Sequence, residues 1–138
     1  MKNFFNLLFL CFMVTILVAC SNKEQYLTRV DIQQVGNDES IEEEKMIVDL
    51  VTLDSIKSLL EEIHWETKSK PDLEGSEDLI ATLFYTQEED MPDQLYLYKM
   101  WFNPDDSLSI VSNNEDEGYG TLDEEYADKL KILFEEYL

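Results

Sequence analysis

Alternation of apolar and polar side chains along the chain predicts β-strands. Successive side chains of a strand point to opposite faces, so an apolar residue at every second position indicates a strand with one buried face. The clearest example is residues 79–86, where Leu79, Ala81 and Leu83 share a face. Residues 45–51 are apolar on both faces, which predicts burial on both sides. Strands are predicted at residues 26–35, 45–51, 79–86, 94–102 and 107–112.

Two other stretches repeat apolar residues every three or four positions, the spacing of an amphipathic helix. The first follows Thr52, a common N-cap residue type, and we expect it to end near His64 and Trp65. The second follows Thr121-Leu122-Asp123-Glu124, which has the spacing of a capping box. The apolar stripes are Leu53, Ile56, Leu59, Leu60 and Ile63 in the first helix, and Leu122, Tyr126, Leu130, Leu133 and Tyr137 in the second.

The order of these elements favours an α+β fold. Runs of consecutive strands are typical of antiparallel sheets, and amphipathic helices cover one face of such a sheet. We therefore expect an antiparallel sheet of about five strands with two helices packed on one face. The predicted order is strand, strand, helix, strand, strand, strand, helix. Residues 26–138 are long enough for one small domain with one core.

Residues 1–19 follow neither period and predict a signal peptide. Lys2 supplies a positive charge, and residues 4–18 are almost continuously apolar. A run of about fifteen residues suits the apolar region of a signal peptide and is shorter than the roughly twenty that a membrane-spanning helix needs. The polar residues 20–25 that follow are suited to a tether.

The apolar run ends in Leu17-Val18-Ala19-Cys20. This stretch resembles the lipobox of bacterial lipoproteins of the Gram-positive type. The resemblance implies cleavage between Ala19 and Cys20 and attachment of a diacylglyceryl group to the Cys20 sulfur. It also implies that the domain lies outside the cytoplasm, anchored to the cell membrane by lipid. Two acyl chains suffice for stable anchoring, whereas one is marginal.

The body of the chain resembles small lipoproteins of bacilli whose role is uncharacterised. The likeness lies in the strand and helix pattern around residues 52–65 and in the closing segment from Tyr119 through Thr121 to the last helix. This resemblance implies no activity.

Charge narrows the set of partners. The chain has 31 acidic and 10 basic residues, a net charge of −21. Such a surface repels nucleic acid and anionic lipid headgroups, and it attracts cations or basic proteins. The plain alternative is that the acids only solvate the surface. Both cysteines, Cys11 and Cys20, precede the body, which therefore has no thiol for a disulfide or a catalytic nucleophile. We expect no cofactor.

Residues 94–102 carry large apolar side chains on both faces of the predicted strand. One face must meet the helices, and the other is a candidate docking surface for a protein or peptide. The alternative is that the rings merely cover a thin sheet. The open face holds either Tyr96, Tyr98 and Phe102 or Leu95, Leu97 and Trp101, and the candidate docking residues are Tyr96, Tyr98, Trp101 and Phe102.

Two polar features are candidate sites. His64 is the only histidine, and no nearby residue is spaced to act as its catalytic partner, so a capping or packing role is expected. In residues 113–124, Gly118 is sixth and Glu124 twelfth, as in a calcium loop. A connection between a strand and a helix is the alternative, because glutamate is long for the third and fifth positions. The candidate metal ligands are Asn113, Glu115, Glu117 and Glu124.

These features favour a membrane-tethered extracytoplasmic lipoprotein whose domain is a non-enzymatic binding or accessory module acting through protein contact. The alternative is a cation-responsive or small-ligand-binding lipoprotein that uses its acidic loops. An enzyme ranks third, because no pair of carboxylates stands out as having an environment that raises a pKa.

Overall fold

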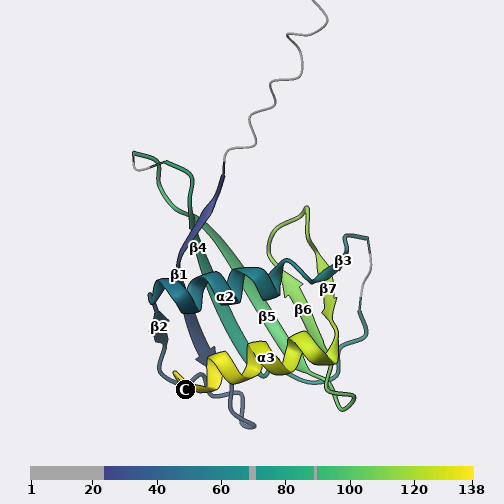
Figure 1. The fold of residues 1–138 in the computed structure, drawn as a ribbon. Helices are drawn as coiled ribbons and strands as arrows, with labels where there is room; N and C mark the ends of the chain where they lie inside the picture. Colours follow the sequence, from purple (N-terminus) through teal and green to yellow (C-terminus); the bar gives the residue numbers. More distant parts are fainter. Residues whose placement is uncertain (1–23, 69–70, 89) are drawn as a thin grey trace, which may run out of the picture.

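The framework of the domain is a single antiparallel sheet. The computed structural model describes residues 24–68, 71–88 and 90–138, which contain seven strands and two helices (Figure 1). The strands are β1 (Tyr26–Gln34), β2 (Lys45–Ile47), β3 (His64–Glu66), β4 (Leu79–Thr86), β5 (Gln94–Phe102), β6 (Leu108–Ser112) and β7 (Tyr119–Leu122), and the helices are α2 (Leu50–Leu60) and α3 (Glu124–Glu135).

The strands follow the order β2-β1-β4-β5-β6-β7-β3 across the sheet. The prediction of an α+β fold with an antiparallel sheet is confirmed, but the described sheet has seven strands rather than about five. The two that were not predicted are β3 and β7, which pair with each other at one edge. Because β2 lies at the opposite edge, α2 crosses the sheet on its way from β2 to β3 (Figure 1).

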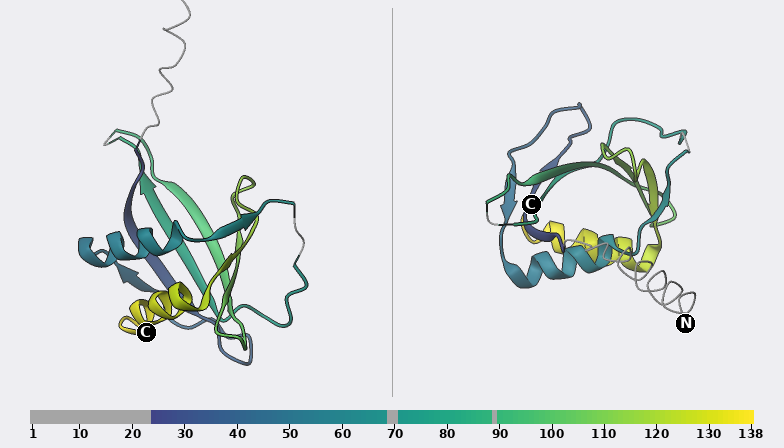
Figure 2. Two further views of the ribbon diagram at one scale, coloured as in Figure 1. Left: turned by 45° about the vertical axis from the view of Figure 1, so that its right-hand side comes forward. Right: turned by 90° about the horizontal axis from the view of Figure 1, so that it is seen from above.

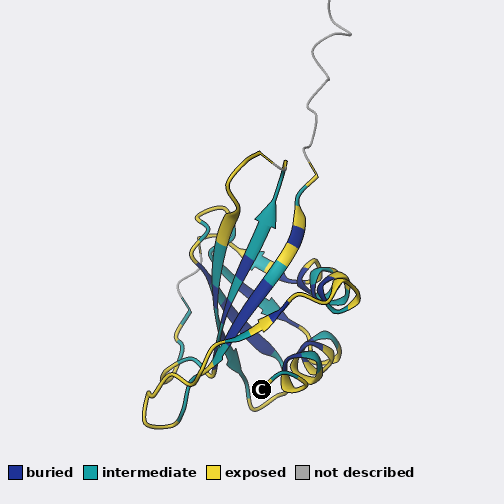
Figure 3. Cartoon of the chain, turned by 90° about the vertical axis from the view of Figure 1, so that its left-hand side faces the viewer, coloured by how far each residue is buried: buried dark blue, intermediate teal, exposed yellow. Residues whose placement is uncertain are grey.

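The sheet is strongly curved, and both helices lie against its concave face (Figure 2). The core fills the space between them, and Figure 3 shows buried residues on the sides where sheet and helices meet. Alternation in β4 places Leu79, Ala81 and Leu83 in this core, as predicted. The helices contribute the fully or almost fully buried Leu53, Ile56, Leu60, Ala127, Leu130 and Phe134.

The sequence around β2 and α2 folds differently from the prediction. The strand expected at residues 45–51 ends at Ile47, and α2 begins at Leu50. Ile47 is fully buried, but Leu50 and Val51 are 78% and 76% exposed, so the expected burial on both sides is wrong. The cause is a helix cap: the carboxylate of Asp49 accepts hydrogen bonds from the backbone N–H and the hydroxyl of Thr52, both at 2.9 Å.

Replacing Asp49 with alanine is expected to lower the melting temperature by a few degrees, because the cap satisfies a backbone donor of the first turn. Asp123→Ala is the matched control, since Asp123 precedes α3 but its side chain makes no capping hydrogen bond. Thermal unfolding followed by circular dichroism at neutral pH compares the two. Equal losses would show that the Asp49 cap does not stabilise the fold.

The predicted capping box before the last helix is also wrong. Thr121 lies in β7 rather than in a cap, and the N-cap of α3 is Asp123. β7 pairs with β3 through His64 with Thr121, Trp65 with Gly120 and Glu66 with Tyr119. The chain from His64 to Glu66 is therefore an edge strand and not the end of a helix.

Candidate functional site

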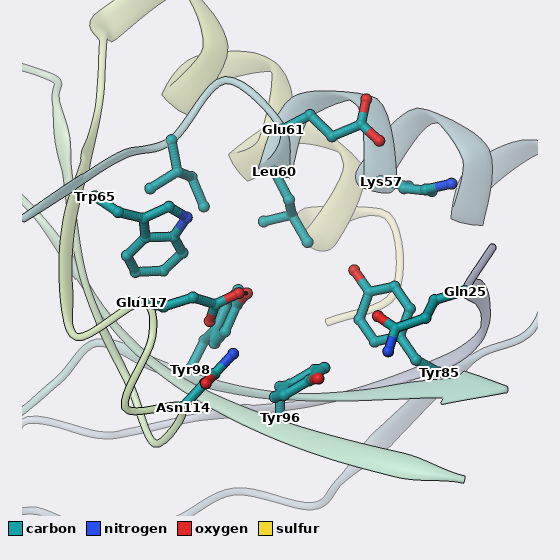
Figure 4. Close-up of a pocket in the computed structure, with 11 residues that line it drawn as sticks. Gln25, Lys57, Leu60, Glu61, Trp65, Tyr85, Tyr96, Tyr98, Asn114 and Glu117 are labelled. Carbon is teal, nitrogen blue, oxygen red and sulfur yellow. Dashed lines mark hydrogen bonds between the residues drawn. The ribbon is translucent and has the colours of Figure 1, made fainter. Parts of the chain in front are cut away.

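A pocket opens at one end of the concave face, between the sheet and the C-terminal end of α2. Its volume is about 360 Å³. β1 begins at the same end, so Gln25 is one of the lining residues, and the chain enters the fold there (Figure 1). Figure 4 shows the residues that line the pocket, which are Gln25, Lys57, Leu60, Glu61, Ile63, Trp65, Tyr85, Tyr96, Tyr98, Asn114 and Glu117.

Aromatic rings from three strands form much of the wall. The ring of Trp65, on β3, meets the ring of Tyr98, on β5, edge to face, with 5.6 Å between centroids. Tyr85, on β4, meets Tyr96, on β5, in the same way and at the same distance. Aromatic pairs of this geometry are favourable beyond the area they bury, which fixes the rings in place.

The carboxylate of Glu117 lies among these rings (Figure 4). Its Oε1 accepts a hydrogen bond of 3.0 Å from the Tyr98 hydroxyl, and its Oε2 accepts one of 2.6 Å from the Ser112 hydroxyl. The loop between β6 and β7, which carries Glu117, is also held in place, because the backbone N–H of Asn114 donates a hydrogen bond of 3.0 Å to the Ser112 hydroxyl oxygen. Among the described residues, no lysine or arginine forms an ion pair with Glu117.

The Tyr85 and Tyr98 hydroxyls remain protonated at neutral pH, because the pKa of each is raised. Burial raises the pKa of Tyr85 to about 12, with a smaller contribution from the negative charge of Glu117. Burial also raises the pKa of Tyr98, together with the nearby Glu117 carboxylate that accepts its hydrogen bond. The Tyr85 hydroxyl points into the pocket in Figure 4 and has no hydrogen-bond partner among the described residues, so it is available to a ligand.

The rim of the pocket carries both signs of charge. Lys57 lies on α2 and Glu61 is the C-cap residue of that helix. Figure 4 shows the Lys57 ammonium on the opposite side of the opening from Glu117. Just before β1, the side-chain amide of Gln25 donates a 2.6 Å hydrogen bond to the side-chain oxygen of Gln94. The same oxygen accepts a 3.1 Å hydrogen bond from the Tyr96 hydroxyl. The rim is therefore tied to β5 by side-chain hydrogen bonds.

Gly120 determines where the Trp65 ring lies. A Cβ atom at position 120 would come within 2.5 Å of the Ile63 side chain and 2.7 Å of the Trp65 ring. We expect Gly120→Ala to destabilise the domain by about 1–3 kcal/mol, because a methyl group inserted into a packed site forces its neighbours to move. Denaturant unfolding measures the loss, and near-ultraviolet circular dichroism reports the displaced ring. An unchanged midpoint together with an unchanged aromatic spectrum would contradict this assignment.

The four candidate docking residues lie in different parts of the structure. Tyr96 and Tyr98 face the helices and line the pocket, and Tyr98 is only 4% exposed. Phe102 faces the helices near the other end of the sheet, beside Phe134. Trp101 lies on the convex face, where its indole N–H donates to the Gly75 carbonyl at 3.4 Å. The four residues therefore do not form one surface; the open face of β5 carries Leu95, Leu97 and Trp101, the other set considered.

The candidate calcium ligands do not converge. The Asn113 side-chain oxygen accepts a 2.8 Å hydrogen bond from the backbone N–H of Leu97, and Glu117 faces the pocket. Glu124 starts α3, beyond the strand β7 that interrupts the expected loop. Within the described ranges, no three His, Cys, Asp or Glu side chains gather as metal ligands. His64 is exposed on β3, with its Nε2 4.0 Å from an Asp123 carboxylate oxygen.

The predicted lipidation and cleavage residues, Ala19 and Cys20, lie outside the described residues. Within the part of the chain that the structure describes, neither helix has the length and apolar character needed to cross a bilayer.

Comparison of the chain with protein-family models, with curated proteins and with solved structures found no match in any of the three.

Proposed function

We propose that the protein is a membrane-tethered extracytoplasmic lipoprotein whose domain is a non-enzymatic binding module, and that the pocket is its binding site. One observation carries the proposal: aromatic rings fixed by mutual contacts line the same pocket as a carboxylate held by two hydrogen bonds. Pockets that bind small molecules are typically concave and largely apolar, with a few polar groups in fixed positions.

The place of the pocket fits a tether at Cys20. Five positions separate Cys20 from Gln25, and an extended chain spans at most about 3.5 Å per residue. With a lipid on Cys20, the pocket would therefore lie within roughly 18 Å of the anchor. A site in this position is suited to ligands at or near the membrane surface.

Contact with a protein partner, the leading hypothesis from the sequence, is the second candidate, here at a surface other than β5. It is supported by exposed apolar side chains where β2 leads into α2: Met46, Val48, Leu50 and Val51 are all more than half exposed. Contiguous exposed apolar side chains often mark contact with another protein. The pocket is the better supported of the two, because it combines apolar walls with polar groups in fixed positions.

The two tryptophans allow a direct test, because Trp65 lines the pocket and Trp101 lies on the convex face. In the Trp101→Phe chain, Trp65 is the sole reporter, and in the Trp65→Phe chain it is Trp101. We expect fractionated envelope components to give a saturable change in Trp65 fluorescence and none in Trp101 fluorescence. A response of Trp101 alone would place binding on the convex face and contradict the proposed site.

A further inference from the structure

We propose that the pocket binds an organic ammonium group, either on a free solute or on a lipid headgroup. This inference names a ligand class for the binding site proposed above and rests on that function. It joins three observations: a carboxylate in the pocket with no cationic partner among the described residues, the rings that line the same pocket and the charge of the whole chain.

The first observation is the charge of Glu117. The carboxylate lines the pocket and accepts hydrogen bonds from Tyr98 and Ser112, but among the described residues no cationic side chain pairs with it. A ligand that covers the pocket removes water from this charge, which is costly unless the ligand supplies a cation. An anionic group placed beside Glu117 would be repelled, since Lys57 lies on the opposite side of the opening, and a neutral apolar group there would leave the Glu117 charge uncompensated.

The second observation distinguishes an organic cation from a metal ion. Ca²⁺ takes six to eight oxygen ligands, and the described residues show no group of three acidic, histidine or cysteine side chains suited to a metal. The pocket instead offers the rings of Trp65, Tyr85, Tyr96 and Tyr98. Aromatic faces attract ammonium groups, and cages of aromatic side chains recognise quaternary ammonium ions.

The site is also prepared before a ligand arrives. Both carboxylate oxygens are already fixed by hydroxyl donors, and the rings support one another in two edge-to-face pairs. Binding to such a site costs little reorganisation. The net charge of −21 attracts cations over a longer range. The Tyr85 hydroxyl, which has no hydrogen-bond partner in the described part of the chain, can pair with a polar group beside the ammonium.

The first experiment compares choline with 3,3-dimethylbutan-1-ol, which has nearly the same shape and no charge. The full chain, carrying Trp101→Phe and held in detergent, is titrated with each while Trp65 fluorescence is recorded. We expect saturable binding of choline and at least about tenfold weaker binding of the alcohol, the difference that a cation-π site with a carboxylate produces. Equal affinities, or no response to choline, would overturn the ammonium site.

The second experiment uses variants. Glu117→Gln keeps the shape and removes the charge, and we expect it to weaken choline binding about tenfold. Glu115→Gln is the control, because Glu115 is exposed on the same loop and does not line the pocket. If Glu117→Gln proves unstable, Tyr85→Leu takes its place. It removes a ring and leaves Glu117 in place, and we expect it to weaken choline binding as well. Unchanged choline affinity in folded Glu117→Gln or Tyr85→Leu protein would contradict the proposal.

A third arm identifies the source of the ammonium group. Phosphatidylcholine vesicles should displace bound choline if the pocket takes a headgroup, whereas phosphatidylglycerol vesicles, which lack an ammonium group, should not. Displacement assigns the site to lipid, and binding of free choline alone assigns it to a solute; equal displacement by both vesicles would contradict the ammonium site. If envelope components change Trp65 fluorescence and choline does not, the binding function stands and the ammonium inference fails.

Discussion

Cys20→Ser is expected to move the protein almost entirely from the membrane fraction to the soluble fraction of the envelope or the medium. Serine has no sulfur to form the thioether with the diacylglyceryl group. Each buried methylene contributes about 0.8 kcal/mol, so loss of two acyl chains removes nearly all membrane affinity. Cell fractionation with immunoblotting measures the shift, and fatty-acid labelling reports the modification itself.

The chain provides its own control for this change. Cys11 lies within the apolar run, before the predicted cleavage point, and would be absent from the mature protein. Cys11→Ser should therefore leave membrane attachment and fatty-acid labelling as they are in the wild type. A Cys20→Ser protein that remained as firmly bound as the wild type, with no label on either, would exclude the lipid anchor.

Phe134→Ala should produce the largest loss of stability, about 3–5 kcal/mol, which is a large part of the stability of a small domain. Phe134 is on α3, is 1% exposed and packs into the core between the helices and the sheet. Its removal forfeits the burial of a large apolar side chain and leaves a cavity that the sheet cannot fully close. Urea unfolding followed by circular dichroism measures the change.

Ile132 is the matched control for Phe134. It lies on the same helix but is 50% exposed, so Ile132→Ala should change the free energy of unfolding by only about 0.5 kcal/mol. If the two variants unfolded at the same denaturant concentration, the face of α3 that meets the sheet would have been assigned wrongly.

The alternation of side chains predicted the long central strands well, because each has one face on the core. β4 and β5 have the bounds that the sequence indicated, and β1 differs by one residue. The short strand β3 could not be found in this way. His64-Trp65-Glu66 has no usable period, and it is a strand only because β7 offers it a partner. β7 itself was obscured by Thr121, which has the spacing of a cap.

The exposed residues at the start of α2 show a second limit. Val48, Leu50 and Val51 continue the apolar pattern of β2, so the pattern alone predicted a longer strand. The capping hydrogen bonds of Asp49 start the helix instead. The contact that decides between strand and helix joins Asp49 to Thr52, three positions later, and the alternation of apolar and polar residues does not register it.

Parts of the candidate site were visible in the sequence, but their roles were not. Tyr96 and Tyr98 stood out as large rings on β5, yet they face the pocket rather than an open docking surface. The sequence indicates Glu117 only as a candidate calcium ligand. Tyr85 meets Tyr96 across the paired strands β4 and β5, whereas Trp65 comes from β3 at the far edge and meets Tyr98 because the sheet curves. Such proximity depends on topology.

Mass spectrometry of the N-terminal peptide, released from protein purified out of cell membranes, tests most directly whether lipid on Cys20 holds the domain outside the cell. We predict a peptide that starts at Cys20, lacks residues 1–19 and carries the mass of a diacylglyceryl group. An N-terminal peptide that retains residues 1–19, or one that starts at Cys20 with no lipid, would contradict the anchor.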